Sequence, residues 1–266
     1  MEISTLVDIF FTSIAYDVER HVMFKRGTAW QVISSRQLYG YVVMLARALK
    51  QWGIRKGDRV AILSENRPEW MIADFACVTT GIVDVPIYAT LTADQTLYLL
   101  QNSRARVIFV STLEQLRKVQ SIQAQTSLEK IVVMDDVSEG NVIPMWSLIK
   151  GASQEQDPQF DEEAHRIQPD DLATLIYTSG TTGTSKGVML SHGNLTACAI
   201  MAQKQAEWTS SDVYLSFLPL SHVTARHVDY TCYLGGVCLA YCAVFDQLPQ
   251  MLQEARPTII VGVPRV

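Results

Sequence analysis

The sequence lacks any dense run of Lys and Arg, and its 22 basic residues against 27 acidic ones give a formal net charge of -5. A nucleic-acid-binding protein needs a basic stripe that follows the phosphate backbone. The sequence also lacks an apolar stretch of the roughly 18 residues that cross a bilayer. Acidic Glu2 and Asp8 lie where a secretory signal carries positive charge. We therefore expect no nucleic acid partner and a soluble, cytoplasmic protein.

Cysteine is scarce as well, with five residues in the chain. An odd number does not suit a disulfide framework, and most of these cysteines have apolar neighbours, so we expect reduced, buried thiols. Cys238 and Cys242 have no second Cys or His pair at ligand spacing, and the sequence therefore predicts no metal ligands.

What the sequence does contain is an alternation of short apolar strands and helices, in a composition that is 48% hydrophobic and 18% charged. This alternation predicts an α/β fold with two βα-layered lobes and largely parallel sheets. Strands are expected at 60–63, 82–85, 107–110, 130–134, 172–177, 213–218, 237–241 and 258–262.

Helix starts are marked by polar residues. Ser34 with Gln37, and Thr92 with Gln95, have the spacing of capping boxes, and Asn66 precedes Pro68 as a candidate N-cap. Residues 151–171 show little periodicity and predict a surface connection.

The predicted organisation has three parts. Residues 1–57 form an N-terminal segment that packs with the second lobe, 58–191 form the first α/β lobe, and 192–266 form part of the second lobe. The sequence stops directly after an apolar strand, so we expect a truncated second lobe and a fragment of a longer protein.

The chemistry is concentrated in the run Tyr177–Gly187, which reads YTSGTTGTSKG and follows an apolar strand directly. Glycines let backbone N–H groups converge on an anion, hydroxyls add donors, and Lys186 adds positive charge. These features predict a polyphosphate site. Lys186 is followed by Gly187 and the glycines do not have Walker spacing, which disfavours an ordinary P-loop NTPase. A flexible Gly/Ser/Thr linker is the alternative.

The longer run 177–192, YTSGTTGTSKGVMLSH, resembles the phosphate-loop signature of the adenylate-forming superfamily, which includes the acyl-CoA synthetases. Weaker matches lie at 81–88, GIVDVPIY, and at 217–223, FLPLSHV. The terminal residues 262–265, GVPR, are similar to the long-chain acyl-CoA synthetase branch. The resemblance therefore covers most of the chain. It implies the N-terminal part of an enzyme like a bacterial long-chain fatty acyl-CoA synthetase.

Enzymes of this superfamily join a carboxylate to AMP from ATP and then transfer the acyl group to a thiol. The resemblance implies ATP, Mg²⁺ and coenzyme A as cofactor and substrates, with Lys186 and His222 as catalytic residues. The residues that it implies for phosphate contact are Thr178, Ser179, Gly180, Thr181, Thr182, Gly183 and Lys186. Arg226 occupies a position where some bacterial long-chain enzymes have a gating tryptophan and others have arginine. An exposed arginine on a helix face is the alternative there.

Three functions remain open. The first is ATP-dependent activation of a long-chain fatty acid to acyl-AMP and then acyl-CoA. The others are an adenylation enzyme that loads an acyl carrier protein and a non-catalytic nucleotide- or lipid-binding module. The adenine, ribose and hinge motifs of the superfamily and its C-terminal domain are missing from this sequence, so we expect the chain alone to be inactive. Peripheral membrane contact for a lipid substrate and oligomerisation are left open.

Overall fold

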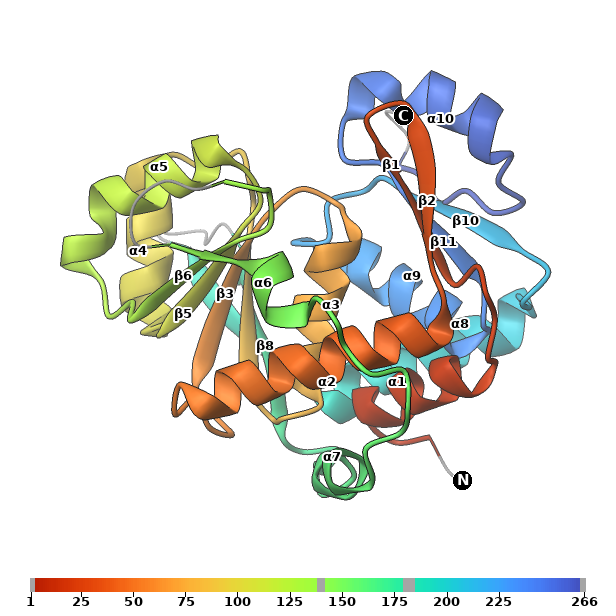
Figure 1. The fold of residues 1–266 in the computed structure, drawn as a ribbon, viewed down its shortest axis with the longest axis horizontal. Coiled ribbons are helices and arrows are strands. Elements are labelled where there is room, and N and C mark those ends of the chain that lie inside the picture. The colour runs from red at the N-terminus through yellow and green to blue at the C-terminus, as the bar shows by residue number, and fades with distance from the viewer. Residues whose placement is uncertain (1–2, 138–141, 179–184, 264–266) are drawn as a thin grey trace.

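The computed structural model of the chain describes residues 3–137, 142–178 and 185–263. Its strands form one sheet of seven strands and one of four, with helices between and around them (Figure 1). Among the described strands only the β1–β2 and β8–β9 pairs are antiparallel, and the other pairs are parallel. The predicted α/β fold with largely parallel sheets is confirmed.

The larger sheet has the strand order β7-β6-β5-β3-β4-β8-β9. Its strands are β3 (Arg59–Leu63), β4 (Val83–Ile87), β5 (Val107–Val110), β6 (Lys130–Val133), β7 (Ile143–Pro144), β8 (Leu172–Thr178) and β9 (Lys186–Ser191). Side chains along a strand alternate between the two faces. Val60 and Ile62 of β3 accordingly pack into one core cluster, whereas Ala61 and Leu63 pack into another.

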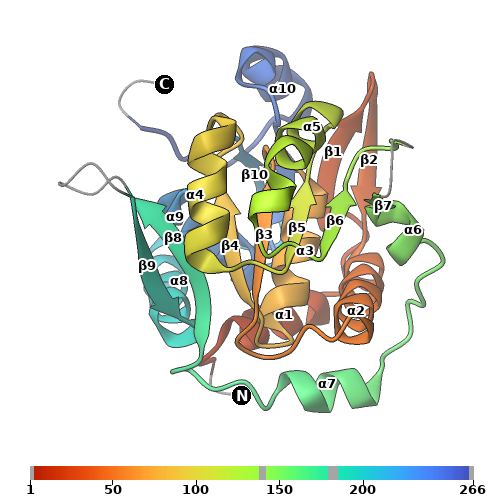
Figure 2. The ribbon, with the colours of Figure 1, turned by 90° about the vertical axis from the view of Figure 1, so that its left-hand side faces the viewer.

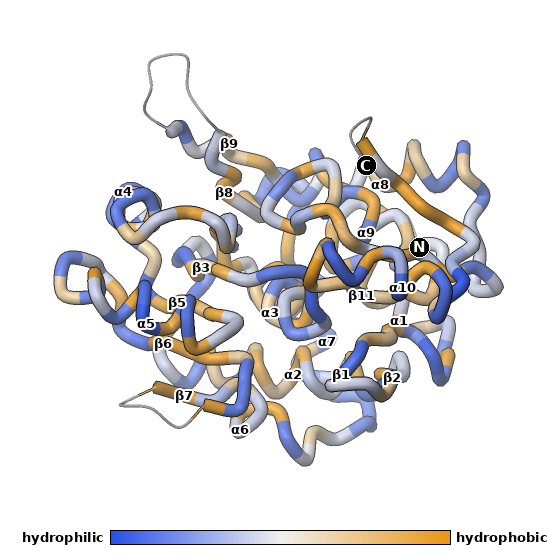
Figure 3. Tube along the Cα trace, turned by 90° about the horizontal axis from the view of Figure 1, so that it is seen from above, coloured by the Kyte–Doolittle hydropathy of each residue, from blue (hydrophilic) through white to orange (hydrophobic). Residues whose placement is uncertain are grey.

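Each face of this sheet is covered by its own layer of helices. One core cluster contains residues of α1 (Leu6–Ala15), α2 (Ser35–Gln51) and α3 (Pro68–Val78). The other contains residues of α4 (Ala93–Ser103) and α5 (Leu113–Ile122), which lie in front of the sheet in Figure 2. Figure 3 shows hydrophobic colour along the strand segments and hydrophilic colour along much of α4 and α5. Apolar burial on both faces therefore holds the sheet in place.

The smaller sheet has the order β10-β11-β1-β2 and joins distant parts of the chain. Its strands are β10 (Val213–Ser216), β11 (Cys238–Tyr241), β1 (Val22–Arg26) and β2 (Ala29–Ile33). Val22 of β1 pairs with Leu239 of β11 in parallel. The β1–β2 hairpin was not predicted; its tight turn contains Gly27 with a φ of +62°, a conformation that favours glycine.

The remaining helices are α6 (Met145–Ile149), α7 (Pro158–Ala164), α8 (His192–Ala206), α9 (Val223–Leu234) and α10 (Leu248–Ala255), with 3₁₀ turns at η1 (Gln123–Gln125) and η2 (Phe245–Gln247). Both predicted capping boxes are confirmed, because Ser34 and Gln37 cap α2 reciprocally and Thr92 and Gln95 cap α4.

Three local predictions are wrong. Asn66 does not cap α3, which begins at Pro68 after Arg67 and has no side-chain cap. Residues 151–171 are not a plain connection, since they contain α7, capped by Asp157. The expected strand at 258–262 is reduced to one bridge between Ile259 and Tyr214. The division at residues 57 and 191 stays a prediction.

Candidate functional site at the phosphate loop

The β8–β9 hairpin carries both ends of the predicted phosphate loop. Thr178 ends β8 and pairs directly with Lys186, which begins β9. Facing residues in an antiparallel ladder have Cα atoms about 4.5–5.5 Å apart and side chains on the same face. Both residues are exposed, so a hydroxyl and an ammonium lie side by side at the base of the loop. The other predicted phosphate contacts, Ser179, Gly180, Thr181, Thr182 and Gly183, lie outside the described residues.

Two tyrosines tie the base of the loop to α4. The hydroxyl of Tyr98 donates to the backbone oxygen of Ser185 over 2.9 Å. The hydroxyl of Tyr177 donates to Oδ1 of Asn102 over 2.6 Å. Tyr98 and Asn102 lie one turn apart on α4, so both strands of the hairpin are held by one helix. These contacts were not predicted, because the sequence carries no local signal for a strand-to-helix hydrogen bond.

His222 is the N-cap of α9 and its side chain is exposed. Its Nδ1 accepts a hydrogen bond from the backbone N–H of Thr224 over 3.2 Å. A neutral ring in this arrangement carries its proton on Nε2, which leaves Nε2 as a donor. Within the described part of the chain, no hydrogen bond or ion pair joins His222 to Thr178 or Lys186. The structure therefore does not bring the two predicted catalytic residues into direct contact.

Arg226 is fully buried, at 0% exposure, and the alternative of an exposed arginine on a helix face is wrong. Its guanidinium forms ion pairs with Asp74 of α3 and Asp84 of β4. It also donates to the hydroxyl of Thr174 on β8 over 2.8 Å. The arginine that the sequence placed near the site is thus a junction between α9 and the larger sheet.

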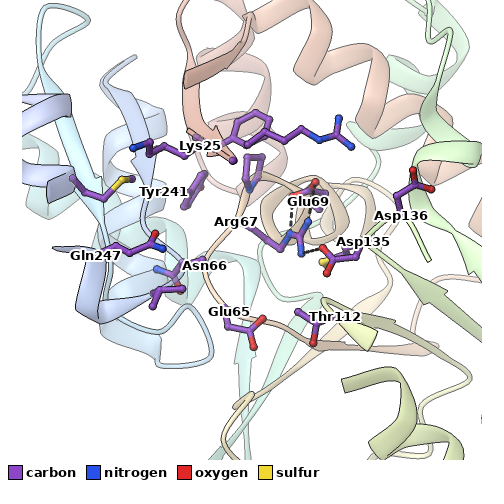
Figure 4. Close-up of a pocket in the computed structure, with 18 of the residues that line it drawn as sticks. Lys25, Glu65, Asn66, Arg67, Glu69, Thr112, Asp135, Asp136, Tyr241 and Gln247 are labelled. Atoms are coloured by element: carbon purple, nitrogen blue, oxygen red, sulfur yellow. Dashed lines mark hydrogen bonds and ion pairs between the residues drawn. The ribbon is translucent and has the colours of Figure 1, made fainter. Parts of the chain in front are cut away.

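A cleft of about 450 Å³ opens between the two sheets. Figure 4 shows the side chains that line it, among them Lys25, Asn66, Arg67, Thr112, Asp135 and Tyr241. It lies at the carboxyl ends of β3 and β5, whose following helices, α3 and α5, cover opposite faces of the sheet. Ligands of open α/β sheets bind at such switch points. Neither His222 nor Thr178 nor Lys186 lines this cleft, and the sequence did not predict it.

Comparison with known proteins settles the family. The sequence model described as AMP-binding enzyme matches residues 11–266, nearly the whole chain. The chain belongs to the AMP-binding enzyme family. The resemblance on which the phosphate loop was assigned is thereby confirmed.

Similar proteins include a long-chain-fatty-acid–CoA ligase of Xenopus laevis, 35% identical over 256 residues that cover 91% of this chain and 34% of the relative. The peroxisomal long chain acyl-CoA synthetase 7 of Arabidopsis thaliana is 33% identical over 286 residues, covering 100% of this chain and 40% of the relative. This AMP-binding enzyme chain therefore spans well under half the length of these relatives.

Solved structures show the same fold. The N-terminal domain of FACL13 from Mycobacterium tuberculosis superposes with a TM-score of 0.83 at 22% identity, over 98% of this chain and 63% of that one. At this identity the likeness shows the fold alone.

Two further properties concern the described residues of this AMP-binding enzyme chain. They include no group of three or more His, Cys, Asp and Glu side chains that could hold a metal ion. These residues therefore contain no preformed cluster for a metal ion, whereas Mg²⁺ at a nucleotide site is usually held by one or two carboxylates together with substrate phosphates and waters. Across the same ranges, no helix is long and apolar enough to cross a membrane.

Proposed function

We propose that the β8–β9 loop binds the phosphates of ATP and that the chain supplies the phosphate-binding half of a long-chain fatty acid activation site. One observation carries the proposal most directly. Thr178 and Lys186, which flank residues 179–185 of the signature, face each other across one ladder pair and are both exposed. A run of glycines and hydroxyl residues between a threonine and a lysine suits a polyphosphate. Similarity to a long-chain-fatty-acid–CoA ligase and a long chain acyl-CoA synthetase supports a long-chain fatty acid as the carboxylate substrate.

In the proposed reaction a fatty acid carboxylate oxygen attacks the α-phosphorus of ATP. The bond from that phosphorus to the bridging oxygen breaks, and pyrophosphate leaves with the electron pair. The thiol sulfur of coenzyme A, having lost its proton, then attacks the acyl carbon, and AMP leaves. The ammonium of Lys186 and the hydroxyl of Thr178 donate to phosphate oxygens as negative charge moves onto the leaving group. Ser179, Gly180, Thr181, Thr182 and Gly183 are proposed as the rest of this donor set.

His222 is proposed to lie at the acyl side of the site. Its free Nε2 donor and exposed ring are suited to a polar group of the adenylate or its acyl carbonyl. We further propose that the 266-residue chain binds ATP but shows little adenylation by itself.

Calorimetric titration of ATP into the chain tests the loop assignment. We expect Lys186→Ala to weaken ATP binding by about tenfold, or ~1.4 kcal/mol, because a charge-assisted hydrogen bond to phosphate is lost. Lys204→Ala is the matched control, since Lys204 is exposed on α8 and lies outside the loop. Equal affinity of the wild type and Lys186→Ala would contradict the assignment, as would failure of the wild type to bind ATP.

Isotope exchange between pyrophosphate and ATP, with palmitate as the carboxylate, measures adenylation. We expect little exchange by the isolated chain. Robust exchange would overturn the proposal that residues 1–266 are insufficient for the first step.

A further inference from the structure

We infer that Arg226 is a positioning residue that fixes the N-terminus of α9, and with it His222, relative to β8 and the phosphate loop. The inference rests on the proposed function for its catalytic meaning. The structural evidence for it is a set of contacts at the buried guanidinium of Arg226, which join α3, β4, β8 and α9.

All five N–H groups of Arg226 have an acceptor. Nε donates to the hydroxyl of Tyr230 over 2.9 Å. Nη1 donates to Oδ1 of Asp84 over 2.9 Å and to Oγ1 of Thr174 over 2.8 Å. Nη2 donates to Oδ2 of Asp84 over 2.5 Å and also to Asp74. A planar guanidinium with every donor satisfied has one permitted orientation, which a flexible ammonium does not reproduce.

The partners of Arg226 also hold one another. The hydroxyl of Tyr230 donates to Oδ2 of Asp74 over 2.6 Å, and that of Thr174 donates to Oδ1 of Asp84 over 2.8 Å. The guanidinium carbon lies 5.5 Å from the ring centre of Trp70 and 5.4 Å from that of Tyr230. Movement of Arg226 would break several of these contacts together, so α3, β4, β8 and α9 are fixed as one unit.

The cluster is close to both parts of the proposed site. Thr174 precedes Thr178 by four residues on β8, a distance of about 13 Å along an extended strand. His222 lies one turn before Arg226, and its backbone oxygen accepts from the N–H of Arg226 over 3.2 Å. That turn spans about 6 Å along the helix axis. The short rigid path from Thr178 to His222 therefore runs through the Thr174–Arg226 hydrogen bond.

The charges explain why removal of Arg226 should move the elements apart. Asp74, Asp84 and Arg226 are all at 0% exposure. Burial raises the pKa of Asp74, and the neighbouring Arg226 opposes that rise. Without the guanidinium, two buried carboxyl groups would face each other with no cation between them, an arrangement that strongly destabilises a fold. Separation of α9 from β4 and β8, with entry of water, would relieve it.

Distance measurement between two spin labels tests the inference without nucleotide. Labels are placed at Val188→Cys on β9 and Val223→Cys beside His222, both exposed positions, in a Cys198→Ser background that removes the exposed natural thiol. We expect one narrow distance distribution with Arg226 present. Arg226→Met should shift or broaden this distance distribution. Arg226→Lys keeps the charge but has fewer donors, so its distribution should be intermediate between those of the wild type and Arg226→Met.

Arg67→Lys and Arg67→Met are the matched controls. Arg67 is also ion-paired with two carboxylates, Glu69 and Asp135, but it lines the cleft. Within the described residues its hydrogen bonds go to Glu69, Asp135 and the backbone oxygen of Ser111, not to β8 or α9. These variants should leave the distribution unchanged. A wild-type distribution in folded Arg226→Met would overturn the inference; if that variant does not fold, a wild-type distribution in Arg226→Lys overturns it instead.

Failure of the proposed function would look different. A wild-type chain that binds no ATP, together with a changed distance in the Arg226 variants, would reject the phosphate site and keep the positional role of Arg226. Normal ATP binding by the wild-type chain, together with an unchanged distance in the Arg226 variants, would keep the phosphate site and reject the positional role of Arg226.

Discussion

Tyr177 is held over Gly187 by its hydrogen bond to Asn102. Tyr177 and Gly187 face each other in the β8–β9 ladder. A Cβ atom built on Gly187 would lie 3.2 Å from Cζ of the Tyr177 ring. Carbon atoms in favourable contact are about 3.5–4.0 Å apart. The ring cannot withdraw freely, because its hydroxyl donates to Asn102 over 2.6 Å. Glycine at 187 thus avoids a tight contact with the tyrosine that anchors the base of the phosphate loop.

We therefore expect Gly187→Ala to lower the free energy of unfolding by about 1 kcal/mol. Overpacking costs about 1–3 kcal/mol, which exceeds the roughly 0.4–1 kcal/mol gained from a less flexible unfolded chain. Urea unfolding measures the change. Val188→Ala, at an exposed position on the same strand, serves as the control. A Gly187→Ala chain as stable as the wild type would show that the ring moves aside at no cost.

Asn66, wrongly predicted as a helix cap, instead joins the two sheets. Its Nδ2 donates to the backbone oxygen of Leu218 over 2.7 Å, and its Oδ1 accepts from the N–H of Leu220 over 3.1 Å. Asn66→Ala leaves both backbone groups without these bonds, so we expect a loss of about 2–3 kcal/mol in the free energy of unfolding. Denaturant titration followed by tryptophan fluorescence measures it. Asn66→Asp keeps the acceptor and loses the donor, so equal effects of the two variants would contradict separate contributions of the two bonds.

How far the sequence predicts this fold depends on the range of each signal. The capping boxes at Ser34 and Thr92 could be predicted because each involves side chains three residues apart. Buried parallel strands could be predicted because each is a short apolar run. The phosphate loop could be predicted because a local pattern of glycines, hydroxyl residues and one lysine directly follows an apolar strand.

The unpredicted features depend on residues far apart in the chain. In the sequence, Arg226 cannot be distinguished from an ordinary exposed helix residue. Its partner Asp84 lies 142 positions earlier, and only the folded chain brings the two together. Val22 pairs with a strand more than 200 residues later, and nothing in 22–33 identifies that partner. The cleft is formed by loops of both sheets and has no sequence motif of its own. Such contacts follow from topology, which short-range periodicity does not determine.

Thiol reactivity tests the burial of the cysteines. All five are free; Cys198 is exposed on α8 and the other four are buried, so the expectation of buried thiols is wrong for Cys198. Burial raises the pKa of the Cys77 and Cys232 thiols well above the usual value. Because the thiolate is the reactive form, we expect one fast reaction with an aromatic disulfide reagent in the native chain. Cys198→Ser should abolish that fast phase; a fast phase that survives would contradict the burial of the others.

Asp229 makes the stability of the chain depend on pH. Its carboxyl is fully buried and accepts hydrogen bonds from two neutral groups, the hydroxyls of Ser216 over 3.0 Å and Tyr241 over 3.0 Å. Burial raises the pKa of Asp229 to about 7, and the two hydrogen bonds oppose this rise. An unfolded aspartate has a pKa of about 3.9. Between these values the folded chain binds more protons than the unfolded chain.

The contribution of Asp229 to stability is therefore fully present below about pH 4 and is lost as the pH rises towards 7. The slope is at most about 1.4 kcal/mol per pH unit. Asn cannot titrate, so Asp229→Asn should remove this loss, and its free energy of unfolding relative to the wild type should rise from pH 5 to pH 7. Asp212→Asn is the control: hydrogen bonds from Thr209 and Thr258 lower the pKa of Asp212, which confines its effect to more acidic solutions. Parallel pH profiles for the wild type and Asp229→Asn would mean that Asp229 is already ionised in the folded chain at pH 5, with water or a cation reaching its carboxylate.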